Sequence, residues 1–576
     1  MVRVARFRGA VRLAGLLPLL TACVLPARAD GSQRQPPAQN SNVATSGASV
    51  PQGFFRIAGT VVNAKTGEAL ARAQVSLADT RNRAAMINVV TGSDGRFEFT
   101  GLGAAKYSLN GSKRGFLSAG YEQHEVFSTA IVTGPNFATD KLELRLTPTA
   151  LISGHVYDES GEGIRRGRVH LYRETRFMGA VNVSGGGTAI TDDRGYYEFA
   201  SLRPGNYYVA ADAKPWYATR GMQRTSRTPR DEPGINSGIA EGLDVAYPTT
   251  YYGGATEADG AAASAVSGGD QIQLDIHLNP VAALHVLFRG QTTPGASPNF
   301  RPPSFIKRGL GSTVTVATEE VQSRPDGTLE VSGLAPGRYT VRYGGGDGGA
   351  MQQSEDVDLG RNGQEFDDLR GTALGSVKVN WKMLGGEPLP GAFSATLSGP
   401  NQRPVDFGQG GSGNDTTLVD VVPGNYTLQV FGGEKNYCVM RITSASGTTE
   451  GHDITIGPGA EQEVTAYVAA GNVTVEGGVQ KNGKSVAGVM VALIPRDPEH
   501  HLEMFRRDQS DFDGTFSMGS VVPGTYTLVA GEDAWGFEWM KPGVLARYVA
   551  HGQNVTIGEL MRGSVKLPGA EEVQPR

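Results

Sequence analysis

The chain contains very little cysteine. Cys23 and Cys438 are the only two among its 576 residues. Cys23 lies in an N-terminal segment that we expect to be cleaved or acylated, so the mature chain has no partner for an internal disulfide. Stability must therefore come from packed apolar cores. Cys438 lies in the apolar run Tyr-Cys-Val-Met, and we interpret it as a buried small hydrophobe rather than a reactive thiol.

The chain also lacks a surplus of either charge and any apolar run long enough to span a membrane. It has 53 Lys and Arg against 58 Asp and Glu, a formal net charge of −5. Nucleic-acid-binding proteins usually carry a basic surplus, so we expect no nucleic-acid partner. A spanning helix needs about 20 apolar residues, and Pro18 and Arg28 interrupt the apolar segment near the N-terminus too early. We therefore expect no transmembrane span in the mature chain.

Apolar residues at helical spacing are absent from any long stretch, whereas glycine is abundant. The 80 glycines are about twice the ordinary proportion. From Phe54 onward, short runs alternate between apolar and polar residues and are separated by Gly, Pro, Asn and Asp, which is typical of β-strands joined by tight turns. A chain of this length exceeds what one hydrophobic core supports, so several domains are expected.

The N-terminal segment 1–29 reads as an export signal, with a basic start and the apolar segment 13–20. Two processing routes stay open. Ala27-Arg28-Ala29 is an ordinary cleavage site, whereas Leu20-Thr21-Ala22-Cys23 resembles a bacterial lipobox, which makes Cys23 a candidate site for a lipid anchor. Residues 30–52 are rich in Gln, Pro, Ser and Asn and are expected to form a disordered linker.

One two-part sequence motif recurs along the chain. Its first part is a tight turn before an alternating strand, at Asp94-Gly95, Asp193-Arg194-Gly195, Asp326-Gly327 and Asp513-Gly514. Its second part is a Pro-Gly pair followed by a strand with a tyrosine, at Pro204-Gly205-Asn206-Tyr207, Pro336-Gly337-Arg338-Tyr339, Pro423-Gly424-Asn425-Tyr426 and Pro523-Gly524-Thr525-Tyr526. An earlier copy keeps Tyr107 without Pro-Gly.

Each part of the motif has a structural reason. Asp-Gly allows the positive φ of hairpin turns, and Pro-Gly is expected to form a type II turn. The tyrosine alternates with apolar residues, so its ring can enter a core while its hydroxyl bonds backbone near the turn. It recurs at positions 107, 207, 339, 426 and 526, and this spacing is the size of a small β-sandwich.

The order Gly-x-Val, Gly turn, second strand, Asp-x-x-Gly-x-Phe-x-Phe and Leu-x-Pro-Gly-x-Tyr resembles the carboxypeptidase regulatory-like domain family. The best copy has Asp158, Gly161, Asp192, Gly195, Phe199, Leu202, Pro204, Gly205 and Tyr207. The resemblance implies seven-stranded, prealbumin-like or Ig-like sandwiches, which are usually non-catalytic. We therefore predict an all-β tandem array with sandwiches at residues 53–148, 149–281, 282–371, 372–470 and 471–569, an inserted loop at 212–262 and a tail at 570–576.

The search for catalytic chemistry finds one pattern, His500-x-x-Glu503, which matches the ligand pair of metallocarboxypeptidases. The pattern lacks the α/β catalytic domain around it, so we interpret it as a surface loop. We predict no enzyme activity, no metal and no cofactor. Aromatic residues give a candidate ligand face, and the alternative for each is a place in the core: Trp216, Tyr217, Tyr251, Tyr252, Trp535 and Trp539.

The expected function is that of an exported, non-catalytic binding and spacer protein of the cell envelope. The resemblance to exported proteins of Gram-negative bacteria implies the periplasm, the outer-membrane surface or secretion. The partner is an unknown protein or glycan. A carbohydrate-binding protein is the first alternative, and an enzyme with an unrecognised site is the second.

Overall fold

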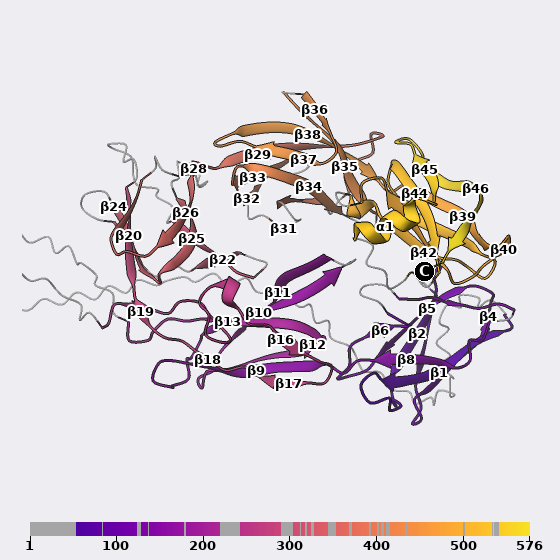
Figure 1. Cartoon of the computed structure of the whole chain (residues 1–576), viewed down its shortest axis with the longest axis horizontal. Helices are drawn as coiled ribbons and strands as arrows, with labels where there is room; N and C mark the ends of the chain where they lie inside the picture. The colour runs from indigo at the N-terminus through magenta and orange to yellow at the C-terminus, as the bar shows by residue number, and fades with distance from the viewer. Residues whose placement is uncertain are drawn as a thin grey trace, which may run out of the picture. The chain divides into compact units, whose positions relative to one another are not determined.

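In the computed structural model, most of the described residues lie in β-strands (Figure 1). The all-β prediction is therefore confirmed. One α-helix, α1 (Pro542–Val549), and two 3-10 turns, η1 (Ala258–Gly260) and η3 (Leu502–Met504), occur in the described part of the chain. None of its helices is long and apolar enough to cross a membrane. The structure describes residues 53–575 except 83–84, 124–127, 136, 178–179, 219–241, 290–302, 311–312, 317–319, 324–327, 344–352, 368–370, 391–392, 400–402, 405–407, 411–414, 433–434, 446, 499–500, 533 and 535–540.

A frame of seven strands in two sheets recurs along the chain. In the first sheet, an opening strand lies between an antiparallel and a parallel neighbour. The opening strands are β1 (Phe55–Asn63), β9 (Ala150–Tyr157), β20 (Leu284–Arg289), β29 (Gly375–Met383) and β39 (Val473–Lys481). Their antiparallel neighbours are β4 (Arg96–Leu102), β12 (Tyr196–Leu202), β24 (Thr328–Leu334), β33 (Asp415–Val421) and β43 (Thr515–Val521). Their parallel neighbours are β8 (Leu142–Leu146), β17 (Gln271–Gln273) with β18 (Ile276–His277), β27 (Gln364–Asp367), β38 (Glu461–Ala470) and β46 (Gly563–Gln574).

The second sheet of the frame has four strands, and the third of them carries the repeated tyrosine. The first copy is β3 (Met86–Val90), β2 (Gln74–Asp79), β5 (Lys106–Ser112) and β7 (Ile131–Val132). The next copies are β11 (Ala180–Ile190), β10 (Arg168–Phe177), β13 (Gly205–Asp212) and β16 (Ser264–Val266), then β22 (Thr313–Val316), β21 (Ser304–Arg308), β25 (Gly337–Tyr343) and β26 (Gln353–Leu359). The last copies are β31 (Arg403–Pro404), β30 (Phe393–Gly399), β34 (Gly424–Gly432) and β37 (Asp453–Ile456), then β42 (Arg506–Gln509), β41 (Met490–Pro495), β44 (Gly524–Gly531) and β45 (Gln553–Ile557).

We call the five copies of this frame modules one to five, with strands β1–β8, β9–β18, β20–β28, β29–β38 and β39–β46. Additional strands extend several of the sheets, and β14 pairs with β19 in a separate two-stranded sheet. In module five β46 pairs with both β39 and β44, so it joins the two sheets. The added strands are β6 (Ala119–Gly120), β14 (Val245–Ala246), β15 (Thr250–Tyr251), β19 (Val281–Ala282), β23 (Glu320–Ser323), β28 (Thr372–Ala373), β32 (Gly408–Gly410), β35 (Tyr437–Ser444), β36 (Gly447–Glu450) and β40 (Lys484–Ser485).

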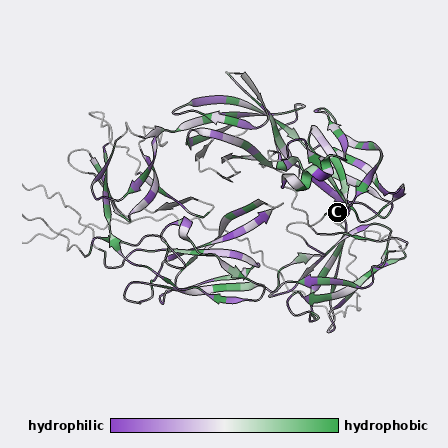
Figure 2. Cartoon of the chain, viewed as in Figure 1, coloured by the Kyte–Doolittle hydropathy of each residue, from purple (hydrophilic) through white to green (hydrophobic). Residues whose placement is uncertain are grey.

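A separate large apolar cluster fills each module. The clusters include Val61, Val209, Val341, Val379 and Val491, none of them more than 1% exposed. Polar and apolar residues alternate along many of the strands (Figure 2), which places one face of each sheet in a core. Because the large clusters are distinct, each module carries its own hydrophobic core.

A β-bulge occurs at the same point of every copy of the frame, where the opening strand pairs with its antiparallel neighbour. Ahead of each repeated tyrosine, at the same offset in every module, one residue has a left-handed φ of 55° to 82°, namely Gly101, Ser201, Gly333, Asp420 and Ser520. A bulge of this kind needs a residue with positive φ. Module four has the feature too, although its Asp-Gly turn is missing from the sequence, so it shares the frame fully.

The repeated tyrosines are buried, and each donates its hydroxyl to a backbone carbonyl four residues earlier. Tyr207, Tyr339 and Tyr526 bond the carbonyls of Arg203, Ala335 and Val522 at 2.7 Å. Tyr426 bonds the carbonyl of Val422, and Tyr107 makes a longer bond of 3.3 Å to the carbonyl of Gly103. The bond closes the loop between two strands that lie in opposite sheets.

The observed turns agree with the prediction for the first part of the motif and differ from it for the second part. Gly95, Gly195 and Gly514 have φ of 71° to 82°, as Asp-Gly turns require, whereas Asp326-Gly327 lies outside the described residues. The expectation of type II turns at Pro-Gly was wrong. Gly205, Gly337 and Gly524 have φ of 149° to 156°, far from the value of about 80° in a type II turn, because these glycines already begin the next strand.

Two predicted boundaries also differ from the structure. The expected tail at 570–576 is mostly strand, because β46 continues to Gln574 and pairs with β39 and β44. Strand β28 pairs with β26, so the third sandwich extends past residue 371. Within the expected loop at 212–262, β15 pairs with β13 and β14 pairs with β19, while 219–241 lie outside the described residues.

Candidate functional site

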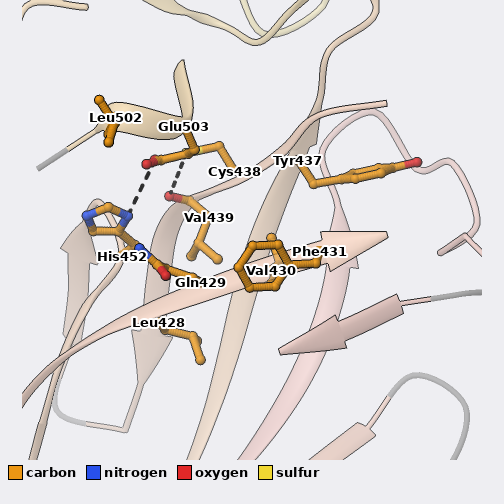
Figure 3. Close-up of a pocket in the computed structure, with 10 residues that line it drawn as sticks. All are labelled: Leu428, Gln429, Val430, Phe431, Tyr437, Cys438, Val439, His452, Leu502 and Glu503. Carbon is orange, nitrogen blue, oxygen red and sulfur yellow. Dashed lines mark hydrogen bonds and ion pairs between the residues drawn. The ribbon is translucent and has the colours of Figure 1, made fainter. Parts of the chain in front are cut away.

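A group of titratable side chains gathers where strand β35 of module four meets the η3 turn of module five (Figure 3). It consists of Cys438, His452, His501 and Glu503. One potential ligand atom from each residue lies within 4.8 Å of those of the other three. Among the described residues, this is the group whose donor atoms are close enough to share one metal ion.

The alternation of strand β35 explains how Cys438 reaches this place. Cys438 and Val439 are adjacent and both are 2% exposed. Successive side chains of a strand point to opposite faces. Val439 packs in the core of module four, whereas Cys438 packs with the core residues of module five. The thiol therefore lies on the outer face of its own module.

The two histidines and the glutamate come from irregular backbone next to strands. His452 follows Gly451, whose φ is 92°, in the turn before β37. His501 precedes η3, and Glu503 lies within it. Such segments hold side chains at the end of a sheet, where they can meet a neighbouring module.

The Glu503 carboxylate is the centre of the group. Its Oε1 atom lies 3.2 Å from Cys438 Sγ, 3.3 Å from His501 Nδ1 and 3.7 Å from His452 Nδ1. The two imidazole rings are 4.5 Å apart between centroids. Figure 3 shows the carboxylate facing His452.

The group is partly open to solvent through a cavity of about 270 Å³. Side-chain exposure is 4% for His452, 26% for His501 and 29% for Glu503. The apolar wall of the cavity includes Leu428, Val430, Phe431 and Leu502. Small solutes can thus reach the donor atoms from the side of Glu503.

Burial and contact with one another shift the pKa values of Cys438, Glu503 and His501. Burial, followed by the charge and hydrogen bond of Glu503, raises the pKa of the Cys438 thiol well above its usual range. Burial opposes ionisation of Glu503, but hydrogen bonds from His501 and Cys438 and the charge of His452 outweigh it and lower its pKa. The hydrogen bond to Glu503 outweighs burial and raises the pKa of His501.

These shifts give a neutral thiol beside an ionised carboxylate. A thiol of raised pKa is a poor nucleophile, because the thiolate is the reactive form. The arrangement therefore offers ligands for a cation rather than a cysteine nucleophile. Arg506 is the nearby fixed cation, and its guanidinium donates to the carbonyls of Glu503, Phe505 and Ser520.

Sequence reasoning found two parts of this group separately. Cys438 is buried, as interpreted. The sequence pattern paired Glu503 with His500, which lies outside the described residues. In the structure His501 and His452 contact Glu503. His452 gave no signal, because it is far from His501 in the sequence and belongs to no spacing pattern.

The candidate ligand face is divided by the structure. Trp216 is 82% exposed and meets Tyr217 edge to face, while the Tyr217 hydroxyl bonds the Glu159 carboxylate. Tyr251 is buried in a small cluster with Tyr172, and Tyr252 packs against the core of module two. Trp535, Trp539 and Cys23 lie outside the described residues.

A second titratable group lies between β14 and β24. His285 is flanked by Glu330 at 2.7 Å and Asp244 at 2.8 Å. Burial disfavours its charge, yet the hydrogen bonds to both carboxylates outweigh burial and raise the pKa of His285. Each ring nitrogen of His285 is paired with a carboxylate, so neither nitrogen is left for a ligand.

Comparison with known proteins gives one family match. The model of the carboxypeptidase regulatory-like domain matches residues 56–137, which include most of module one. No curated protein sequence matches the chain.

Solved structures with similar segments include a Bacillus anthracis protein and two pilins. The Bacillus anthracis TIE protein is 11% identical, with 72% of this chain and 74% of that chain covered and a TM-score of 0.17. A minor pilin of Streptococcus agalactiae is 9% identical, with 39% and 96% covered and a TM-score of 0.20. The shaft pilin SpaA of Lactobacillus rhamnosus is 8% identical, with 39% and 98% covered and a TM-score of 0.18.

The family match agrees with the resemblance inferred from the repeated turns and tyrosine. Residues 56–137 of this chain are therefore similar to a carboxypeptidase regulatory-like domain.

Proposed function

We propose that this chain is an exported, non-catalytic binding and spacer protein of the cell envelope. The observation that carries the proposal is the repetition of one seven-strand frame with its own core in each module. Repetition of a self-contained sandwich extends a chain and presents loops at successive positions. Function on such folds belongs to loops and surfaces.

Export is supported by the basic and apolar N-terminal segment. The test is to express the full-length chain in a Gram-negative host, separate periplasm, membranes and medium, and determine the mature N-terminus by mass spectrometry. We expect either a start at Asp30 or a lipid-modified Cys23. A cytoplasmic chain that still carries segment 1–29 would contradict the proposal.

The absence of catalysis is supported by the high thiol pKa of Cys438 and by the lack of a recognisable catalytic motif in the sequence. The purified chain should be inactive on panels of peptidase, esterase and glycosidase substrates. Turnover that disappears in Cys438→Ser or Glu503→Gln would overturn this part of the proposal.

Carbohydrate binding is a second candidate, and the exposed Trp216 ring beside Tyr217 favours it. Aromatic faces stack on sugar rings. A glycan array should then give a specific signal that Trp216→Ala removes and that the control Phe54→Ala, which removes another exposed aromatic ring, retains. A blank array, or a signal that survives Trp216→Ala, counts against this candidate.

A further inference from the structure

We propose that Cys438, His452, His501 and Glu503 form a binding site for one Zn²⁺-like divalent ion, and that the ion fastens module four to module five. The site is independent of the proposed spacer function, because it rests on four side chains and their distances. Two ligands come from each module, Cys438 and His452 from module four and His501 and Glu503 from module five.

The distances fit a tetrahedral ion. Zinc binds sulfur at about 2.3 Å and nitrogen or oxygen at about 2.0 to 2.2 Å, which places tetrahedral ligand atoms about 3.3 to 3.6 Å apart. Three of the six ligand pairs are measured at 3.2, 3.3 and 3.7 Å, all of them to Glu503 Oε1. The remaining pairs lie within 4.8 Å, so small side-chain rotations complete the geometry.

The donor types select the ion. Thiolate and imidazole ligands suit Zn²⁺, Cu⁺ and related ions, whereas Ca²⁺ and Mg²⁺ prefer sites made entirely of oxygen. One thiolate, two imidazoles and one carboxylate are four ligands of the kind found in closed, structural zinc sites. The two anionic ligands neutralise a divalent ion, so the nearby Arg506 does not face a net positive charge.

Binding requires the thiol to give up its proton. The S–H bond of Cys438 breaks, the proton passes to solvent, and the sulfur binds the ion as thiolate. A protonated His501 likewise releases one proton. In the metal-free state the same groups hold one another through the Glu503 carboxylate, and this keeps the donor atoms together before the ion arrives.

Access to the site comes from the cavity, whose lining includes Cys438, His452 and Glu503. Little of His452 and Cys438 is exposed, whereas Glu503 and His501 are partly exposed. An ion that enters the cavity therefore meets ligand atoms of both modules, and neither core has to open.

The test uses the full chain without a polyhistidine tag, stripped of metal by a chelator. Native mass spectrometry and competition with a chromophoric chelator should give one Zn²⁺ per chain with submicromolar affinity. Co²⁺ should give the strong near-ultraviolet absorption of a thiolate ligand and the visible bands of a tetrahedral site. These measurements need no variant, so they do not depend on the folding of a mutant.

Variants then assign the ligands. Cys438→Ser should abolish the thiolate absorption and weaken Zn²⁺ binding by about 100-fold, and the partly exposed His501→Asn should weaken it by at least about 10-fold. The control His551→Asn removes an exposed histidine of the same module outside the group and should change nothing. The proposal is overturned if the chain binds no stoichiometric Zn²⁺, if Co²⁺ shows no thiolate absorption, or if both ligand variants bind like the control.

Discussion

Replacing Tyr526 with phenylalanine tests the tyrosine bond that recurs in every module. The substitution keeps the ring in the core and removes only the hydroxyl, which donates to the carbonyl of Val522 at 2.7 Å. Val522 is 1% exposed, so its carbonyl loses this partner in a buried place. A lost hydrogen bond with a stranded buried acceptor costs about 1 to 3 kcal/mol.

Module one provides a matched control. Tyr107 bonds the carbonyl of Gly103 at the longer distance of 3.3 Å, and the same carbonyl also accepts the Thr133 hydroxyl at 2.7 Å. Tyr107→Phe therefore leaves the carbonyl satisfied. We expect it to cost about 0.5 kcal/mol, the low end for a single hydrogen bond.

The assay is hydrogen exchange of the full chain, read by mass spectrometry on peptides from single modules. A free-energy change of about 1.4 kcal/mol alters an equilibrium constant tenfold. Tyr526→Phe should therefore speed exchange of protected amides in β41 and β44 by about 10-fold or more, and Tyr107→Phe should speed exchange in β2 and β5 by about 2- to 3-fold. Equal effects at the two sites, or no effect at Tyr526, would refute the reasoning.

Three other substitutions test ionisation and backbone strain. Burial, and then the charge of Glu572, raise the pKa of Glu571 to about 7. The stability that this group contributes is present below about pH 4.3 and is lost as the pH rises through about 7. Glu571→Gln should therefore leave the free energy of unfolding in denaturant unchanged near pH 4 and raise it by up to about 3 kcal/mol at pH 8. The pKa of His285 is raised, so its contribution to stability is complete below about pH 6.5 and is lost as the pH rises through its pKa in the folded chain. Hydrogen exchange in β20 and β24 should therefore speed up at alkaline pH in the native chain. The same dependence of exchange on pH in His285→Gln would contradict this. Ser520 has a φ of 55°, which costs a non-glycine residue about 1 kcal/mol or more, so Ser520→Gly should slow exchange in β43 by about 2- to 5-fold, and faster exchange would argue against strain at the bulge.

The repeated fold could be predicted because its signals are local. Asp-Gly turns, alternating strands and a tyrosine at domain-sized intervals each follow from the backbone and side chain of a few neighbouring residues. The bulge could not be predicted, because its left-handed residue is Gly, Ser or Asp in different modules. The bulge is imposed by pairing with a strand that is distant in the sequence rather than by one residue type.

The candidate site was hidden for the same physical reason. Cys438, His452 and His501 lie on three separate segments, and only the packing of two modules brings them together. Sequence alone indicated a buried thiol at Cys438 and a loop near Glu503. It had no means of showing that the thiol faces away from its own core, since that depends on which side of β35 meets module five.

Substitution of Val209 by aspartate in the full chain tests most directly whether each module is held by its own core. Val209 lies in β13, is 1% exposed and belongs to the core of module two. Burying an unpaired charge there should unfold that module. We predict that peptides from β9 to β13 lose protection from hydrogen exchange, while peptides from β29 to β46 keep theirs. Parallel loss of protection in all modules would contradict the account, because it would mean that one cooperative core holds the whole chain.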